Sequence, residues 1–313
     1  MSISKEIERL QKAKKDIGDA IVRKGGSVSG TIDTYAKSVM ALGDVSFRTA
    51  IDIVNKSDAK NVDLTMISPK NETSLEYLFE KNTNLININV SNWDTSNITS
   101  LRGVFSSIPN LESVECAEWN VSNVTTFRAM FDGDSKLKNI DISKWDTNKS
   151  TVFEWCFSNC NSLVELDVSN LKTQNCTLFH SMFGACHSVT QLDVSNFDMA
   201  NAIDTISMFA YCVSITSLDI SNFDLSNVRN IDYMFKRTGK LATLKTTNLK
   251  LPNIDMGLIG FNDSPLTVDS IVGLLNALPQ SDKGYSFQIG SNNIAKLSDE
   301  QKAIATNKGW TLI

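Results

Sequence analysis

The sequence predicts an α/β solenoid, in which short coils of chain stack on one another and share a parallel sheet. Three observations predict this fold. The same apolar positions recur with a fixed 26-residue period over seven units, each unit combines a strand-like pattern with a helix-like one, and the segments before and after the units lack the repeat. The chain therefore has three predicted parts: a helical N-terminal segment, the repeat, and a C-terminal cap made of helices and a strand.

Residues 1–44 precede the repeat and form a predicted helical attachment or oligomerisation segment. A heptad-like apolar spacing, interrupted at Lys14, is made by Ile3, Ile7, Leu10, Ile17 and Ile21. About three heptads are marginal for a free helix. The helix therefore either pairs with other copies as a homo-oligomer, docks on a partner, or packs on a second helical pattern at 32–40, beyond a glycine-rich break at 25–30.

Residues 45–255 form the predicted repeat of about eight coils. Each unit reads F-x5-L-x2-L-x-V-x2-W/F, and its L-x2-L-x-V part predicts a short, half-buried strand. Stretches such as NITSLRGVF, which end in the Phe, predict a helical turn or a 3₁₀ segment on the opposite side. One strand and one helical piece per coil is the plan of a leucine-rich repeat, whose coils must stack to bury their apolar faces. The Phe column consists of Phe79, Phe105, Phe131, Phe157, Phe183, Phe209 and Phe235.

An asparagine follows the large apolar residue of each unit by four positions, with Lys149 as the exception. A side-chain amide has two donors and two acceptors, and neighbouring coils lie about 5 Å apart. We therefore expect these amides to bridge backbone groups of successive coils, which is a structural role. The column consists of Asn97, Asn123, Asn175, Asn201, Asn227 and Asn253.

Three later units read SLVELDVSNLKTQN, SVTQLDVSNFDMAN and SITSLDISNFDLSN. This pattern, which covers about residues 53–255, resembles the bacterial-surface-protein type of leucine-rich repeat and implies a right-handed stack with a parallel sheet. Such repeats are similar to those of bacterial adhesins and of phage or prophage structural proteins. The stretch AKKDIGDAIVRKGGSVSGTIDTYAKSVMAL also resembles a small N-terminal module of phage tail and fibre proteins.

Residues 256–313 leave the repeat and predict a C-terminal cap. The stretch LTVDSIVGLLNALP predicts a helix capped by Thr267 or Asp269, and LSDEQKAIATNKG predicts a second helix that begins near Ser298. A final strand is predicted at 310–313. A repeat stack needs a cap because its last coil otherwise exposes apolar surface and an unpaired strand edge. The ending also resembles the tail of phage-encoded repeat proteins.

No catalytic or metal-binding constellation stands out, so we expect neither an enzyme nor a cofactor. The six cysteines fall mostly in apolar columns, which favours buried free thiols, although a disulfide ladder along Cys160, Cys186 and Cys212 is conceivable. The cysteine spacing is not a zinc signature. Two histidines, His180 and His187, lie in different columns without a third group to orient a nucleophile.

Charge and hydropathy exclude several classes of partner. The net charge of −5 gives no basic footprint, so a nucleic-acid partner is not expected. No apolar run approaches the length of about 18 residues that a spanning helix needs, so membrane insertion is not expected either. The segment 1–25 is charged throughout and lacks the apolar region of a secretory signal peptide, which predicts synthesis and retention in a cytoplasm or exit by another route.

Two polar columns flank the buried strand position and should point outward from the parallel sheet. Acidic groups in line at about 5 Å repel one another modestly in solvent and could bind cations or a basic partner. The alternatives are that each carboxylate caps a local turn or is simply solvated. This candidate recognition face consists of Asn87, Ser113, Asn139, Glu165, Gln191 and Ser217 together with Asn89, Glu115, Asp141, Asp167, Asp193 and Asp219.

Two functions fit these features. The first is a structural protein of a phage or prophage virion, made in the host cytoplasm and associated with a tail or fibre. Its repeat would supply receptor-binding or assembly contacts to other virion proteins, or to a host surface receptor or glycan. The second is a bacterial cell-surface adhesin that binds protein or glycan. Both are binding roles, because a repeat supports a fold more strongly than any one chemistry.

Overall fold

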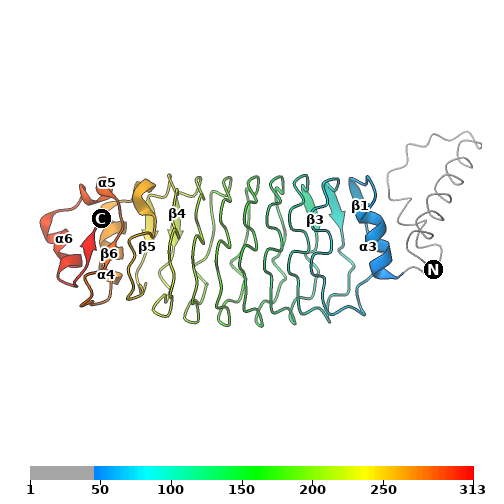
Figure 1. Cartoon of the computed structure of the whole chain (residues 1–313), viewed down its shortest axis with the longest axis horizontal. Coiled ribbons are helices and arrows are strands. Elements are labelled where there is room, and N and C mark those ends of the chain that lie inside the picture. Colours follow the sequence, from blue (N-terminus) through cyan, green and yellow to red (C-terminus); the bar gives the residue numbers. More distant parts are fainter. Residues whose placement is uncertain (1–45) are drawn as a thin grey trace, which may run out of the picture.

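The computed structural model describes residues 46–313, in which the chain winds into an elongated stack of coils (Figure 1). Helix α3 (Phe47–Asn55) lies at one end of the stack and the C-terminal helices lie at the other. The predicted attachment segment, residues 1–44 with its apolar helix spacing, lies outside the described residues. No helix within 46–313 is both long and apolar enough to cross a membrane.

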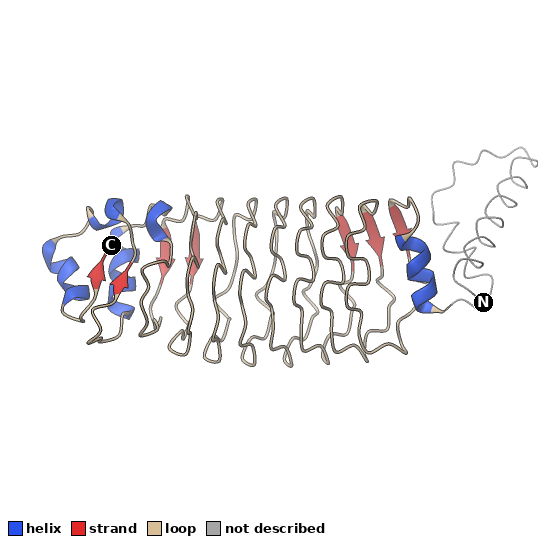
Figure 2. Ribbon diagram, viewed as in Figure 1, coloured by secondary structure: helices blue, strands red, loops and turns tan. Residues whose placement is uncertain are grey.

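Short parallel strands run along one side of the stack (Figure 2). Equivalent residues of successive units pair with one another, so that Val62 pairs with Ile88 and Ile88 with Val114, which confirms the predicted repeat and parallel pairing. In each strand the central side chain is buried and the flanking ones point outward. The strands are β1 (Asn61–Asp63), β2 (Asn87–Asn89), β3 (Ser113–Glu115), β4 (Ser217–Asp219) and β5 (Thr243–Lys245).

The opposite side of each coil is a ribbon of turns, so the predicted helical or 3₁₀ segment there is wrong. The N–H groups of Tyr77 and Phe79 donate to carbonyls of the next coil, those of Arg102 and Val104, both at 2.9 Å. Two positions per coil, separated by three others, have a positive φ, which interrupts a right-handed helix. Over the middle coils these pairs are Ala129 and Gly133, Trp155 and Asn159, Ser181 and Ala185, and Ser207 and Tyr211.

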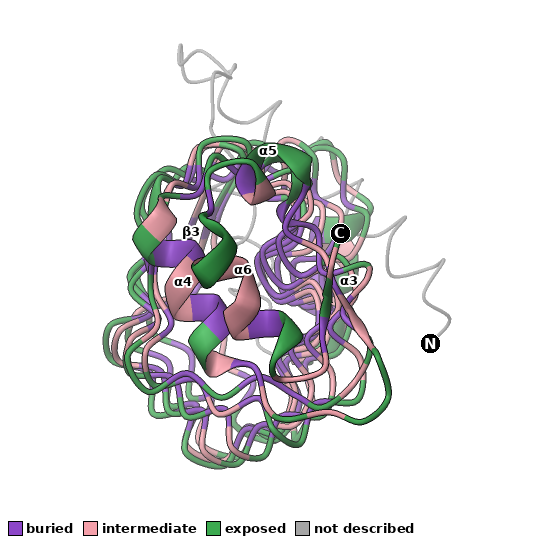
Figure 3. Ribbon diagram, turned by 90° about the vertical axis from the view of Figure 1, so that its left-hand side faces the viewer, coloured by how far each residue is buried: buried purple, intermediate pink, exposed green. Residues whose placement is uncertain are grey.

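Aromatic side chains stack through the centre of the coils. The rings of Phe105 and Phe131 lie 5.4 Å apart and almost parallel, and those of Trp93 and Trp119 lie 5.7 Å apart. The indole N–H of Trp119 donates to the carbonyl of Val90 at 2.9 Å, so the ring is buried without leaving its donor unpaired. Viewed along the stack, buried positions occur on several sides of the coils (Figure 3), and these residues form one connected hydrophobic cluster. One continuous core therefore runs through all the repeats.

The asparagine column bridges successive coils, as predicted. The side-chain amide of Asn123 donates to the carbonyl of Ser96 at 2.8 Å, and that of Asn175 donates to the carbonyl of Asn148 at 2.7 Å. Each bond reaches back by one coil and satisfies a carbonyl at the edge of the neighbouring coil. Asn253, the last of the column, bonds forward to the carbonyl of Gln280 instead.

Helix α3 covers the first coil, and the sequence patterns did not predict it. The helix begins after Ser46, whose hydroxyl accepts the N–H of Thr49. It buries Ala50, Ile51 and Val54 against the stack. The α3 contact closes the apolar end of the core that the first strand would otherwise expose.

The C-terminal cap contains the predicted helices and final strand. Thr267 caps the first predicted helix and Ser298 the second, where Gln301 completes a capping box. The Lys308 ammonium donates to three carbonyls at the end of α4. Trp310, just before the last strand, is fully buried. The elements are η1 (Phe261–Asp263), α4 (Val268–Ala277), β6 (Ser286–Phe287), α5 (Ser291–Ile294), α6 (Asp299–Thr306) and β7 (Thr311–Leu312), and β6 pairs with β7.

Candidate functional site

The two polar columns of the predicted recognition face do lie on the outer side of the strands. Their side chains are exposed or half-buried in every coil. Neighbouring coils share hydrogen bonds on this face: the Ser113 hydroxyl donates to Asn87, and the Asn87 amide donates to Asn61, both at 2.6 Å. The face is therefore a flat polar surface that is partly bonded to itself.

The acidic column on this face is engaged in local turns. Asp141 accepts the backbone N–H of Ser143 at 3.0 Å and its hydroxyl at 2.7 Å, and Asp167 and Asp193 accept the corresponding groups of Ser169 and Ser195. The Ser143 hydroxyl is the main cause that lowers the pKa of Asp141. These contacts match the alternative in which each aspartate caps a turn.

A groove of about 290 Å³ lies on the turn side of the middle coils, which sequence reasoning missed. It spans four coils between Asp132 and Tyr211. Most of the residues that line the groove, at the positive-φ positions or next to them, have small side chains. The surface is therefore lower there than at the two larger aromatic residues on either side. The small residues that line it are Ser158, Ser181, Gly184, Ala185, Ser207 and Ala210.

Trp155 and Tyr211 frame this groove. The guanidinium carbon of Arg128 lies 4.6 Å from the centre of the Trp155 ring, and the His180 ring lies 5.0 Å from it, which together hold the indole in place. Arg237, one coil beyond Tyr211, lies over the Tyr211 ring at 5.4 Å. Because alanine occupies the same position on the preceding coil, the tyrosine face on that side borders the groove.

A polar pair sits at the Trp155 end of the groove. The Asn159 amide donates to a carboxylate oxygen of Asp132 at 3.0 Å and to the Ser158 hydroxyl at 2.9 Å. These two bonds fix the amide nitrogen and leave the amide oxygen, as well as the second oxygen of Asp132, as acceptors. The groove thus combines aromatic walls with preorganised polar groups, which is typical of small-ligand sites.

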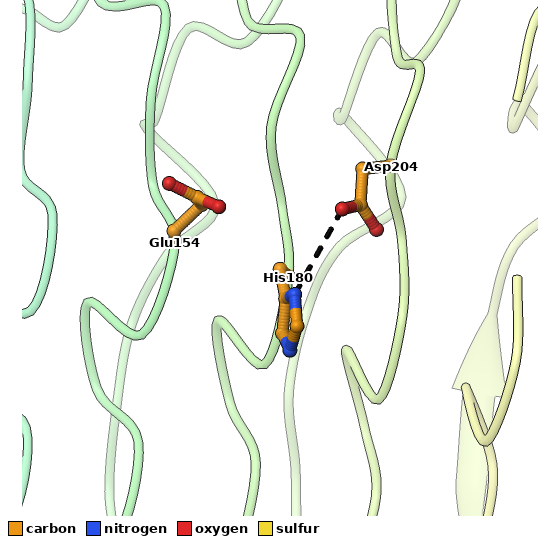
Figure 4. Close-up of side chains that lie close together, drawn as sticks. All are labelled: Glu154, His180 and Asp204. Atoms are coloured by element: carbon orange, nitrogen blue, oxygen red, sulfur yellow. Dashed lines mark ion pairs between the residues drawn. The ribbon is translucent and has the colours of Figure 1, made fainter. Parts of the chain in front are cut away.

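A charged cluster is drawn in Figure 4, and its His180 ring lies beside the ring of Trp155. It is formed by Glu154, His180 and Asp204 of three successive coils, and one ligand-type atom from each lies within 4.8 Å of the others. Nδ1 of His180 is 3.8 Å from Oδ2 of Asp204, and Arg128 pairs with Glu154 at 2.9 Å. Glu154 falls one full period before His180 in the sequence, but Asp204 falls two positions short of the next period, so the three residues do not form a column. His187 lies apart from this cluster.

The cysteines are free and buried, as predicted, and no disulfide ladder joins them. The thiols of Cys160, Cys186 and Cys212 each donate to a phenylalanine carbonyl of the preceding coil, at 3.1–3.2 Å. Burial raises the pKa of all six thiols, that of Cys212 to about 12. A thiol this hard to ionise is a poor nucleophile and metal ligand.

Comparison with solved structures finds low similarity. A leucine-rich repeat protein from Bacteroides ovatus is 14% identical with a TM-score of 0.41, over 67% of this chain and 46% of that one. The functional domain of InlJ from Listeria monocytogenes, described as including a cysteine ladder, is 12% identical with a TM-score of 0.17, over 74% of this chain and 67% of that one. This chain thus spans about half the length of the Bacteroides protein. No curated protein matches it.

A family model matches the repeat twice, over residues 73–192 and 153–254, and the two overlapping matches together cover more than half of the chain. Both matches include coils that carry the groove and the charged cluster. The chain belongs to the family described as Mycoplasma protein of unknown function, DUF285.

Proposed function

We propose that this protein is a recognition protein of a microbial cell surface, and that the groove between Trp155 and Tyr211 binds carbohydrate. The repeat acts as a leucine-rich-repeat-type right-handed solenoid that presents the groove on a rigid scaffold. The observation that carries the proposal is the groove itself, because it interrupts an otherwise regular surface with two aromatic walls and a floor of small residues.

Sugar rings have apolar C–H faces and a rim of hydroxyl groups, and the groove offers a partner for each. The tyrosine face that borders the groove can pack against a C–H face. The acceptors of Asp132 and Asn159 can receive two neighbouring hydroxyl donors, since their mutual hydrogen bond already fixes their positions. The volume of about 290 Å³ is close to the lower end of small-ligand sites.

The virion location, the virion partners and the self-association that the sequence suggests remain predictions. A virion location, contacts with tail or fibre proteins and self-association through residues 3–21 are compatible with a glycan-binding groove. Among these functions, the groove favours an adhesin that binds a host glycan without catalysis. The flat strand face, including Gln191 and Asp193, is the alternative contact surface.

The test is a glycan-array screen with the whole chain, followed by titration of the glycans that bind. Tyr211→Ala removes one wall and should weaken binding about tenfold, as expected for one aromatic contact. Ala185→Tyr fills the groove and should abolish binding. Tyr77→Ala is the matched control, because Tyr77 is also an exposed ring at positive φ but lies on the first coils.

The control should bind like the wild type. Two outcomes would overturn the proposal: an array on which no glycan binds, or binding that survives Ala185→Tyr. Binding lost in Asp193→Lys and kept in Ala185→Tyr would instead place recognition on the strand face.

A further inference from the structure

We propose that Glu154, His180 and Asp204 form a binding site for one divalent transition-metal ion of the Zn²⁺ type. The three side chains come from three successive coils and lie close together (Figure 4), next to Trp155, which borders the groove. One imidazole and two carboxylates, with positions left open for water, are a ligand set that suits such ions.

The distances fit one ion after small side-chain movements. Bonds from Zn²⁺ to nitrogen and oxygen are about 2.0–2.2 Å and are arranged tetrahedrally, so two ligands of one ion lie about 3.4 Å apart. The 3.8 Å between Nδ1 of His180 and Oδ2 of Asp204 is close to this spacing, and it is too long for a hydrogen bond. All three ligand atoms lie within 4.8 Å of one another, so Glu154 needs to approach by at most about 1.4 Å.

The surroundings position these ligands. The N–H of Ile206 donates to Oδ1 of Asp204 at 2.9 Å, which holds the carboxylate with its other oxygen near His180. Arg128 contacts Oε2 of Glu154, and Figure 4 shows one oxygen of Glu154 on the side of His180. Such supporting contacts orient metal ligands in known sites.

Burial and charge favour an added cation. Glu154 is only 8% exposed, and its Oε2 has no hydrogen bond of good geometry despite the ion pair with Arg128. Two carboxylates against one guanidinium leave one excess negative charge beside the imidazole. A partly buried negative site attracts a dication more strongly than an exposed one, because solvent screens it less.

The ion would also act on the proposed carbohydrate groove. His180 packs against Trp155, the wall of that groove, so coordination fixes the imidazole and with it the indole. This effect depends on the proposed function, whereas metal binding itself does not. The two ideas can therefore fail separately.

The experiment is isothermal titration of the untagged whole chain with Zn²⁺ at pH 7.5, repeated with Co²⁺ to record the visible absorption of the bound ion. We expect one ion per chain. His180→Ala should lower the affinity at least tenfold, and Asp204→Asn, which keeps the shape of the side chain, should do the same. His187→Ala is the matched control because the chain has only these two histidines, and it should bind like the wild type.

Absence of binding to the wild-type chain would overturn the assignment, and so would equal affinities for His180→Ala and His187→Ala. Ala185→Tyr distinguishes this site from the groove, because it should block carbohydrate and leave the affinity for Zn²⁺ unchanged. If the metal binds and no glycan does, the metal site stands and the carbohydrate function falls.

Discussion

Asp134 is a carboxylic acid with no exposed surface, and we predict that Asp134→Asn stabilises the protein increasingly as the pH rises from 4 to 7. One oxygen accepts the N–H of Ile108 at 2.8 Å, and the other is buried without a hydrogen-bond partner. Burial raises the pKa of Asp134 well above its ordinary value, and the charge of nearby Asp132 adds to the effect.

The sign follows from proton uptake. The folded state holds the Asp134 proton more tightly than the unfolded state does, so the contribution of this group to stability is greatest below the unfolded pKa of about 3.9. That contribution is lost as the pH rises through the folded pKa. Within this window each pH unit costs the wild type about 1.4 kcal/mol. Asparagine does not titrate and keeps the acceptor for Ile108, so it avoids the loss.

The assay is urea unfolding of both proteins at pH 4, 5, 6 and 7. The difference between their free energies of unfolding should grow with pH at close to this slope. Asp282→Asn is the control, because its side chain is 88% exposed, and its profile should run parallel to that of the wild type. Parallel profiles for Asp134→Asn would refute the reasoning, since they would mean that Asp134 is ionised in the folded protein.

Two further predictions concern the ladders between coils. Lys149→Asn should raise the free energy of unfolding by up to about 1 kcal/mol in thermal or urea denaturation, because the new amide can donate to the carbonyl of Ser122, as the asparagines of the neighbouring coils do. A lower free energy of unfolding would show that the hydrogen bond from Lys149 to Asn123 contributes more. All six thiols should stay unreactive toward a thiol reagent at pH 8 in the folded protein and react together in urea, since burial keeps them protonated; rapid labelling of the folded chain would contradict the closed core.

The repeat could be predicted because it is redundant. A column such as Phe105, Phe131 and Phe157 places the same buried aromatic residue at the same position of each coil, and these rings stack on one another in the structure. The asparagine column was predictable for the same reason. The turn ribbon was not, because Trp155 and Tyr211 adopt positive φ although their side chains do not favour it. There the bonds to adjacent coils override local preference.

The groove and the charged cluster could not be predicted, because both depend on departures from the repeat. Ala185 matters only as a gap between larger side chains on neighbouring coils. His180 meets Asp204 diagonally, because the backbone keeps the 26-residue register, in which Asp204 pairs with Leu178. A comparison of all columns at the two positive-φ positions would have shown aromatic residues on either side of small ones, which is the signal that sequence reasoning passed over.

The hydrogen bonds between coils have a mechanical consequence. They join each turn of chain to the next one along the stack, as between Phe105 and Met130 or Phe131 and Cys156. A force that pulls the two ends apart therefore peels coils from an end one at a time. Each detached coil releases one repeat of chain, which is about 90 Å long when fully extended. Such a stack yields in steps under load and absorbs work with each step, while the coils that are still stacked keep their structure.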